Sequence, residues 1–414
     1  MRVLQRAPRS KRPLRFRPPP IEPTPQLLWL LEAAFADHAA ALPPLKEQQE
    51  LVSLAERLSL AERIWSRRKE GLEAAPGLLV LAEGLRGAHA RSVAISTLYE
   101  TVAREVAGAA SEASIPLIFL KGYALVASGR IPRGRRPFSD LDVLVKTEDA
   151  ERLHRQLRRR GFVAQAASGN EQHLASLTPP AGGTLDIHFC LHGLALDGSR
   201  WATADELEER NLLEHLAGHT DNCLVPTLGL LCAHLLIHGM AQHIWLPDQY
   251  PLLRLVGDLI DVLPDDDSWE DSLQDFGGAL SASIPDPDLA AFRELTQELR
   301  LGRRLDLDGK APDPAAVLLR HMLAGALEPN YSASLRPRHA VNRMLAAARQ
   351  GKLRAYLERK LRPLSDPDAT TGGGKFASRF RGHLATAGRA IRGKRHGRHR
   401  SRDRSEKDAA DSIE

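Results

Sequence analysis

Two acidic residues interrupt an apolar run, and this feature constrains the fold more than any other part of the sequence. The run reads Ser-Asp-Leu-Asp-Val-Leu-Val at residues 139–145 and has the length and composition of a buried strand. Side chains two positions apart in a strand point to the same face, so Asp140 and Asp142 project together. Neighbouring carboxylates repel each other unless a positive group lies between them. A hard divalent cation such as Mg²⁺ is the expected occupant.

A third acidic residue lies in a second apolar run. Asp186 belongs to Gly-Thr-Leu-Asp-Ile-His-Phe-Cys-Leu at residues 183–191, which also reads as a strand. Three carboxylates in one sheet can hold two cations about 3.5–4 Å apart and promote an in-line displacement at phosphorus. One acid can also help to deprotonate an acceptor hydroxyl. The pattern therefore predicts phosphoryl or nucleotidyl transfer.

The segment ahead of the first acidic strand carries groups that suit phosphate. Residues 115–120 read as a short apolar strand, and Lys121 and Gly122 follow where the chain turns into a short helix. A backbone N–H and a point charge at such a turn can bind phosphate oxygens. The Gly- and Arg-rich loop 129–138 comes next, and its Arg136 can neutralise phosphate charge.

Each feature also has a purely structural interpretation. Lys121 can be a surface lysine, Arg136 a partner of Asp140, and His188 a histidine that packs beside the sheet. A lone Asp-x-Asp also occurs at strand ends and in glycosyltransferases, although those enzymes have a larger α/β domain where this sequence is mostly helical. The order of the parts, from strand through Lys-Gly turn and Gly/Arg loop to the two acidic strands, favours a functional site.

These motifs, in this order, resemble an uncharacterised bacterial nucleotidyltransferase-like family of the DNA polymerase β-type nucleotidyltransferase superfamily. The resemblance covers roughly residues 85 to 265 and rests on Leu120-Lys121-Gly122, Gly134–Pro137, Ser139–Asp142, Asp186–Phe189, His238 and Asp258. Two departures are visible. Most of the superfamily has Gly-Ser where this chain has Lys-Gly, and an aromatic phenylalanine replaces the more usual tryptophan.

The resemblance implies a fold, a site and a reaction. The implied fold is α+β, a small mixed β-sheet flanked by N- and C-terminal helical regions. The implied reaction is metal-dependent transfer of a nucleoside monophosphate from an NTP to a hydroxyl of an unidentified acceptor (a small molecule, a sugar or a protein), with Mg²⁺ or Mn²⁺ as cofactor. The implied catalytic residues and metal ligands are Asp140, Asp142 and Asp186. The implied nucleotide-binding residues are Lys121, Gly122, Arg136, Ser139 and His188.

Changes of pattern along the chain predict five regions. They are a disordered basic Pro-rich arm (1–24), a helical region (25–113), an α/β core (114–220), a second helical region (221–364) and a disordered basic tail (365–414). Apolar residues at three- and four-residue spacing predict the helices. Within the core we also expect a helix at 147–161, strands at 162–166 and 172–177, and a helix at 204–216.

The formal charge of +5 hides a strong asymmetry. Residues 375–404 hold eleven Lys or Arg against one acid, and the first 17 residues hold seven and no acid. Removing the resulting +10 and +7 from +5 leaves −12 for the rest of the chain. Such basic segments bury too little apolar surface to fold. Because the tail has few aromatic residues to stack on bases, we favour a solubilising role for it over nucleic-acid binding.

Two alternatives to the enzyme stay open. A protein with this fold can act as a regulator that binds a nucleotide or metal without turnover. It would then bind Mg-NTP and release no pyrophosphate. Alternatively, the basic tail can bind nucleic acid or another anionic surface, with a steep dependence on salt. The sequence leaves the oligomeric state open.

Three histidines near the middle of the chain also need an interpretation. The spacing of His234, His238 and His243 could serve a zinc site, but no carboxylate lies within the same helical pattern. We therefore expect His238 to pack near the active-site cleft instead.

Cysteines and hydropathy bear on the compartment. The three cysteines lie in or beside apolar runs without metal-like pairing, which predicts buried reduced thiols; they are Cys190, Cys223 and Cys232. The basic arm lacks the apolar core of a secretory signal, and we find no run that is long and apolar enough to span a bilayer. A cytoplasmic location is expected by elimination.

Overall fold

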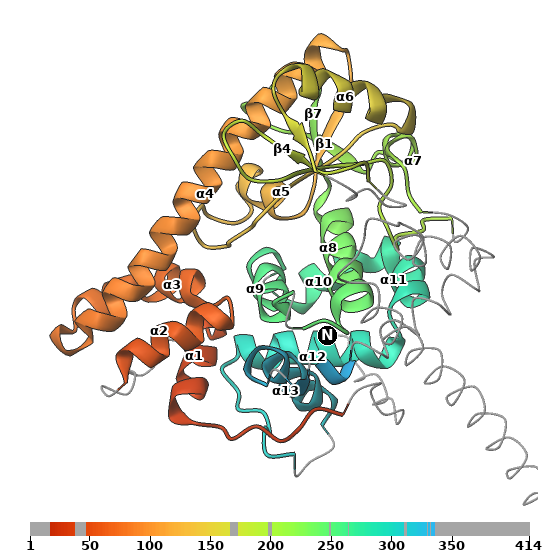
Figure 1. Cartoon of the computed structure of the whole chain (residues 1–414). Coiled ribbons are helices and arrows are strands. Elements are labelled where there is room, and N and C mark those ends of the chain that lie inside the picture. The colour runs from red at the N-terminus through yellow and green to blue at the C-terminus, as the bar shows by residue number, and fades with distance from the viewer. Residues whose placement is uncertain are drawn as a thin grey trace, which may run out of the picture. The chain divides into compact units, whose positions relative to one another are not determined.

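The structure is a computed structural model that describes residues 17–37, 47–165, 173–197, 201–247, 250–263, 265–309, 313–328, 330–331 and 333–335. The predicted basic tail, and the predicted arm as far as Phe16, lie outside these residues. The chain divides into two compact units, Met1–Pro329 and Asn330–Glu414, and the elements below belong to the first. They combine helices with a mixed sheet (Figure 1), which confirms the predicted α+β class.

Helices precede the sheet, as the spacing of apolar residues predicts. They are α1 (Pro25–Phe35), α2 (Gln48–Arg57), α3 (Ala61–Glu73), the short 3-10 helix η1 (Pro76–Leu78) and α4 (Leu79–Glu112). At the start of α1 the Thr24 hydroxyl accepts a hydrogen bond from the backbone N–H of Leu27 at 3.2 Å, which caps the helix. With 34 residues, α4 is roughly 50 Å long. It runs from the other N-terminal helices to the sheet (Figure 1).

The sheet found among the described residues has the strand order β3-β4-β5-β2-β1-β7-β6. Its strands are β1 (Leu117–Phe119), β2 (Leu141–Leu144), β3 (Val163–Ala164), β4 (Leu177–Thr178), β5 (Leu185–His188), β6 (Leu213–His215) and β7 (Cys223–Pro226). Every residue of β1 and β2 is buried. Strands covered on both faces read as continuous apolar runs, and for this reason the two acidic residues stood out in the sequence.

The pairing of β2 with β5 brings the acidic residues together. The two strands are parallel, with Asp142 beside Asp186 and Leu144 beside His188. Since side chains alternate between the two faces of a sheet, Asp142, Asp186 and His188 share one face. Asp140 precedes β2 by one residue and lies two positions before Asp142. The prediction that the two acidic strands share a sheet is therefore confirmed.

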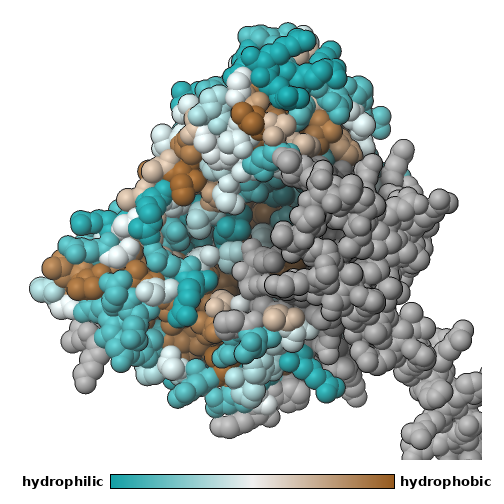
Figure 2. Space-filling view, viewed as in Figure 1, coloured by the Kyte–Doolittle hydropathy of each residue, from teal (hydrophilic) through white to brown (hydrophobic). Residues whose placement is uncertain are grey.

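Helices α5 (Lys121–Ala127) and α6 (Thr147–Arg159) pack beside this sheet. Helix α5 contacts β2, and α6 contacts both β5 and α4. The arginine- and glutamate-rich outer face of α6 contributes to the strongly hydrophilic surface at that end of the molecule in Figure 2. Helix α6 confirms the helix expected from residue 147.

The segment 204–216 differs from the predicted single helix. Helix α7 (Ala204–Glu209) is short, and Asn211 has a left-handed backbone with φ of 55°. That conformation ends a right-handed helix, and the chain continues as β6, which pairs antiparallel with β7. Because β7 also pairs with β1, the sheet continues past residue 220. Strand β3 is shorter than the expected run 162–166, and β4 overlaps the expected run 172–177 only at Leu177. Residues 166 and 172 of these runs lie outside the described part.

Further helices follow β7. They are α8 (Leu228–Leu236), the π-helix η2 (Ile237–His243), α9 (Leu252–Val262), α10 (Asp266–Leu273), the 3-10 helix η3 (Gln274–Phe276), α11 (Gly277–Ser283), α12 (Asp286–Arg300) and α13 (Pro314–Leu327). Helix α8 packs against α5 and α9, so it connects the sheet to the C-terminal helices. Within the described ranges no helix has the length and apolar character needed to cross a membrane. All three cysteines are buried, as predicted, and none of them forms a disulfide bond within the described residues.

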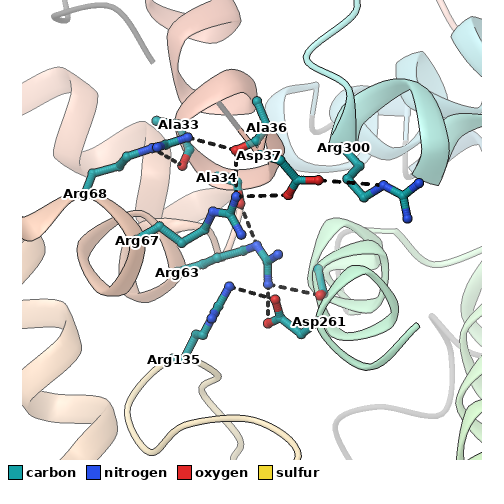
Figure 3. Close-up of polar contacts among 11 residues, drawn as sticks. Ala33, Ala34, Ala36, Asp37, Arg63, Arg67, Arg68, Arg135, Asp261 and Arg300 are labelled. Carbon is teal, nitrogen blue, oxygen red and sulfur yellow. Dashed lines mark hydrogen bonds and ion pairs between the residues drawn. The ribbon is translucent and has the colours of Figure 1, made fainter. Parts of the chain in front are cut away.

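An arginine cluster joins the N-terminal helices, the Gly/Arg loop and α9 (Figure 3). Arg63 of α3 donates to the carbonyl oxygen of Ala34 at the end of α1 (2.6 Å) and to Asp261 of α9 (2.5 Å). Arg135 of the loop also contacts Asp261, at 2.7 Å. The loop that leads into the acidic strand is therefore fixed by helices outside the sheet.

Candidate active site

A cavity of about 250 Å³ lies over the acidic face of the sheet. The predicted site residues all line it: Asp140, Asp142, Asp186, Lys121, Gly122, Arg136, Ser139 and His188. Six further residues complete its wall: Phe138, His173, His238, His243, Tyr250 and Arg254. The fold thus collects side chains from β2, β5, α5, the Gly/Arg loop, η2 and α9 around one space.

Asp142 is a buried anion with two nitrogen donors. It is only 3% exposed, and its Oδ1 lies 2.6 Å from Nζ of Lys121 and 2.8 Å from Nε2 of His188. Burial by itself would raise the pKa of Asp142, but the Lys121 ammonium and the His188 hydrogen bond hold that pKa well below its usual range. Asp142 is therefore ionised at neutral pH.

Asp140 has the opposite electrostatic environment. Repulsion from Asp142 raises the pKa of Asp140, and burial adds to the increase. The Oγ of Ser139 donates a long hydrogen bond, of 3.4 Å, to Oδ1 of Asp140. Two neighbouring carboxyl groups whose pKa values are shifted in opposite directions indicate an excess of negative charge. A cation bound between them would relieve it.

Three side chains at the sheet are close enough to hold a metal ion. Asp142, Asp186 and His188 each offer one ligand atom, and these atoms lie within 4.8 Å of one another. A hydrogen bond from Oγ of Ser176 to Oδ1 of Asp186, at 2.5 Å, fixes the second carboxylate. Burial lowers the pKa of His188, which keeps its ring neutral. To bind a metal through Nε2, His188 would exchange its hydrogen bond with Asp142 for the ion.

The sequence did not predict His188 as a metal ligand, because a lone histidine beside a sheet is usually structural. The pairing register supplies the missing information, since it brings His188 next to Asp142. Carboxylate oxygens with one imidazole nitrogen form a suitable donor set for Mn²⁺ and other divalent ions. Asp140 lines the same cavity, and its role as a further ligand stays a prediction.

The Lys-Gly turn is packed against Arg136. Lys121 has a left-handed backbone, with φ of 49°, which is unusual for a residue other than glycine. A Cβ atom on Gly122 would lie 2.1 Å from Nη1 of Arg136, so only glycine fits beneath this turn. Arg136 is 5% exposed and pairs with Oδ2 of Asp258 at 2.7 Å. Its positive charge is therefore matched within the protein.

The opposite wall of the cavity comes from η2, α9 and the segment between them. His243 stacks on Tyr250, with ring centroids 4.8 Å apart and an interplanar angle of 18°. His238 lies edge-on to Tyr250 at 5.2 Å, and burial, followed by the Lys121 charge, puts its pKa well below the usual value. The prediction that His238 packs near the cleft is confirmed.

Sequence reasoning missed Arg254 and Tyr250 in this wall. One signal could have found Arg254, because it lies four residues before Asp258. Residues four apart share one face of a helix, so Arg254 belongs to the face of α9 that reaches Arg136. Tyr250 gives no comparable signal in the sequence.

One comparison with known proteins identifies a family for this chain. A family model described as "Uncharacterised nucleotidyltransferase" matches residues 44–306. That range is more than half of the 414-residue chain, and it contains the whole sheet and the cavity wall. No curated protein matches the chain.

Proposed function

We propose that this chain, which belongs to the uncharacterised nucleotidyltransferase family, transfers a nucleoside monophosphate from an NTP to a hydroxyl group of an acceptor. The observation that carries the proposal is the meeting of Asp142, Asp186 and His188 on adjacent strands at the cavity. Family membership and a group of this kind fit a metal-binding nucleotidyltransferase.

The acidic residues would hold the divalent cation. Asp142 and Asp186 provide carboxylate oxygens on neighbouring strands, and Asp140 adds a third carboxylate at the mouth of β2. Mg²⁺ or Mn²⁺ bound there supplies charge neutralisation at the α-phosphate and lowers the pKa of a coordinated hydroxyl. The raised pKa of Asp140 supports this assignment, because a cation would favour its ionised form.

The residues around the Lys-Gly turn would hold phosphate. Lys121 Nζ reaches Asp142 across the cavity floor, so it can also reach a phosphate oxygen that approaches the same carboxylate. The side chain of Ser139 and the backbone of Gly122 lie in the same wall. Burial lowers the pKa of Lys121, but the neighbouring carboxylates, Asp142 first, raise it by more. The ammonium therefore stays charged.

Asp186 is our proposed acceptor of the proton from the attacking hydroxyl. One of its oxygens accepts the hydrogen bond from Ser176, which leaves the other to face the cavity. A base in this position must lie within hydrogen-bond reach of the hydroxyl that it activates. The acceptor and the preferred NTP are to be identified by experiment.

The test is release of pyrophosphate with Mg²⁺ or Mn²⁺ and each of the four NTPs, with a cell lysate as the source of acceptor. The native protein is compared with the double variant Asp140→Asn, Asp142→Asn. Asp205→Asn is the matched control, because Asp205 is an exposed carboxylate on α7 that pairs with Lys146. We expect release by the native protein and by the control only. Equal release by the double variant would contradict the proposal.

One observation favours a second candidate, a regulator that binds a nucleotide without turnover. The Lys121 ammonium already neutralises Asp142 at 2.6 Å, at a turn where most of the superfamily has Gly-Ser. Binding of Mg-NTP by the native protein, without pyrophosphate release from any of the four NTPs, would select this candidate. Nucleic-acid binding through the basic tail concerns residues outside the described part and stays a prediction.

A further inference from the structure

Arg254 is a cation of the cavity wall that forms no ion pair with a carboxylate among the described residues, although Asp258 and Asp140 act on its charge from farther away. It lies on α9, with its Cζ 5.2 Å from the ring centroid of Tyr250. Its Nη1 donates to the carbonyl oxygen of Pro137 at 3.1 Å. Its Nε is buried and has no hydrogen-bond partner there. Burial and the nearby Arg136 lower the pKa of Arg254, and Tyr250, Asp258 and Asp140 restore only part of it, so the surroundings disfavour the positive charge.

The other two cations of the cavity wall differ from Arg254 in this respect. Lys121 pairs with Asp142 at 2.6 Å, and Arg136 pairs with Asp258 at 2.7 Å. Moving a charge out of water without a partner is energetically costly. A site that retains such a charge at a cavity wall is prepared for an anion that arrives from outside the protein.

The geometry of the guanidinium indicates which anion fits. Arginine presents its N–H groups in a rigid fork that matches two oxygens of one phosphate or carboxylate. In Arg254, Nη1 already donates a hydrogen bond to the carbonyl oxygen of Pro137. The Nε and Nη2 edge makes no hydrogen bond with the described residues. These two nitrogens form the side-on pair of the fork, which binds an oxyanion through two parallel hydrogen bonds.

We propose that the Nε and Nη2 edge of Arg254 binds a phosphate group of the nucleotide. The inference rests on the proposed function. Arg254 lines the same cavity as Asp140 and Asp142, so a phosphate held by its guanidinium is close to the acidic face. An anionic group on the acceptor has the same chemistry, and the experiment below uses phosphate ligands without any acceptor, so that a loss of affinity reports on the nucleotide phosphates alone.

The proposal changes the expected role of Arg136. The sequence suggested Arg136 for phosphate, but Asp258 matches its charge and Gly122 packs directly on its guanidinium. Arg136 then holds the Lys-Gly turn in place, while Arg254 contacts the ligand. Substitution of Arg136 should therefore lower the stability of the fold, whereas substitution of Arg254 should weaken ligand binding.

The test measures binding by isothermal titration calorimetry for the native protein and for Arg254→Met, Arg254→Lys and Arg155→Met. Arg155→Met is the matched control, because Arg155 is exposed on α6. The ligands are a nucleoside, its NTP with Mg²⁺, and inorganic pyrophosphate. We expect Arg254→Met to weaken binding of the NTP and of pyrophosphate 10- to 100-fold and to leave nucleoside binding unchanged. Arg254→Lys, which keeps a point charge but loses the fork, should weaken both about tenfold.

Thermal unfolding of the same variants separates binding from folding. Arg254→Met removes an unmatched charge and should keep or raise the melting temperature, whereas Arg136→Met leaves Asp258 buried without its partner and should lower it. Equal NTP affinity in Arg254→Met and the native protein would overturn the proposal. An equal loss for the nucleoside would overturn it too.

One further outcome concerns the proposed function alone. If the native protein binds pyrophosphate through Arg254 but neither binds nor turns over any of the four NTPs, the oxyanion site stands and the nucleotidyltransferase assignment fails.

Discussion

Asparagine substitutions at Asp140 and Asp142 should change folding stability in opposite directions, although the two residues lie side by side and undergo the same chemical change. Asp142 is 3% exposed and accepts hydrogen bonds from Lys121 and His188 on one oxygen. Asp140 has a raised pKa, chiefly because of repulsion from Asp142. The Asp142 carboxylate therefore stabilises the metal-free fold, whereas the Asp140 carboxylate destabilises it.

The contacts set the magnitude. Removing one partner of a buried ion pair costs about 3–5 kcal/mol, since the other charge is left behind. For Asp142→Asn we expect a value near the lower end, because the Lys121 side chain is 15% exposed and keeps some contact with water. Asp140→Asn removes a repelled charge, so the free energy of unfolding should rise.

Urea unfolding at pH 7 in the presence of EDTA measures both changes, with Asp205→Asn as the control for a surface carboxylate. A saturating divalent cation should then stabilise the native protein by RT ln(1 + [M]/Kd), about 2.7 kcal/mol at one hundred times Kd. Both variants should lose that gain. A loss of stability in Asp140→Asn as large as that in Asp142→Asn would refute the inference that Asp142 stabilises the metal-free fold and Asp140 destabilises it.

Three further predictions follow from individual contacts. The pKa of Asp142 is lowered in the folded protein. The ionised carboxylate therefore adds to the free energy of unfolding above its unfolded-state pKa of about 3.9, and this addition is lost as the pH falls through the pKa of the folded state. In urea unfolding, the difference in stability between the native protein and Asp142→Asn should narrow below about pH 4. Gly122→Ala would place a Cβ 2.1 Å from Nη1 of Arg136, and calorimetric melting should show a loss of about 1–3 kcal/mol. Tyr99→Phe removes the hydroxyl that donates to the carbonyl oxygen of Ser139, which should cost about 1 kcal/mol and slow pyrophosphate release; an unchanged rate would show that this tether does not position the loop.

Much of the fold followed from local patterns. Strand β2 and the helices on both flanks could be predicted locally, because the spacing of apolar residues along the sequence indicates which segments are buried strands or amphipathic helices. The two acidic runs were recognisable because a carboxylate inside a buried strand needs a partner. The eight predicted residues line one cavity, while the role of each remains our proposal. The strand β6 was missed because a short run such as Leu-Leu-Glu-His fits either period, and only pairing with β7 decides between them.

The acidic strands, the Lys-Gly turn and the helical flanks can be predicted from the sequence, since each depends on residues close together in the chain. Which charges meet depends on how the chain folds. Lys121 pairs with Asp142, and Asp258 pairs with Arg136 across 122 positions, which leaves Arg254 without an ion pair among the described residues. Charge pairing acts through space and depends on distance and burial, and the order of residues along a chain records neither.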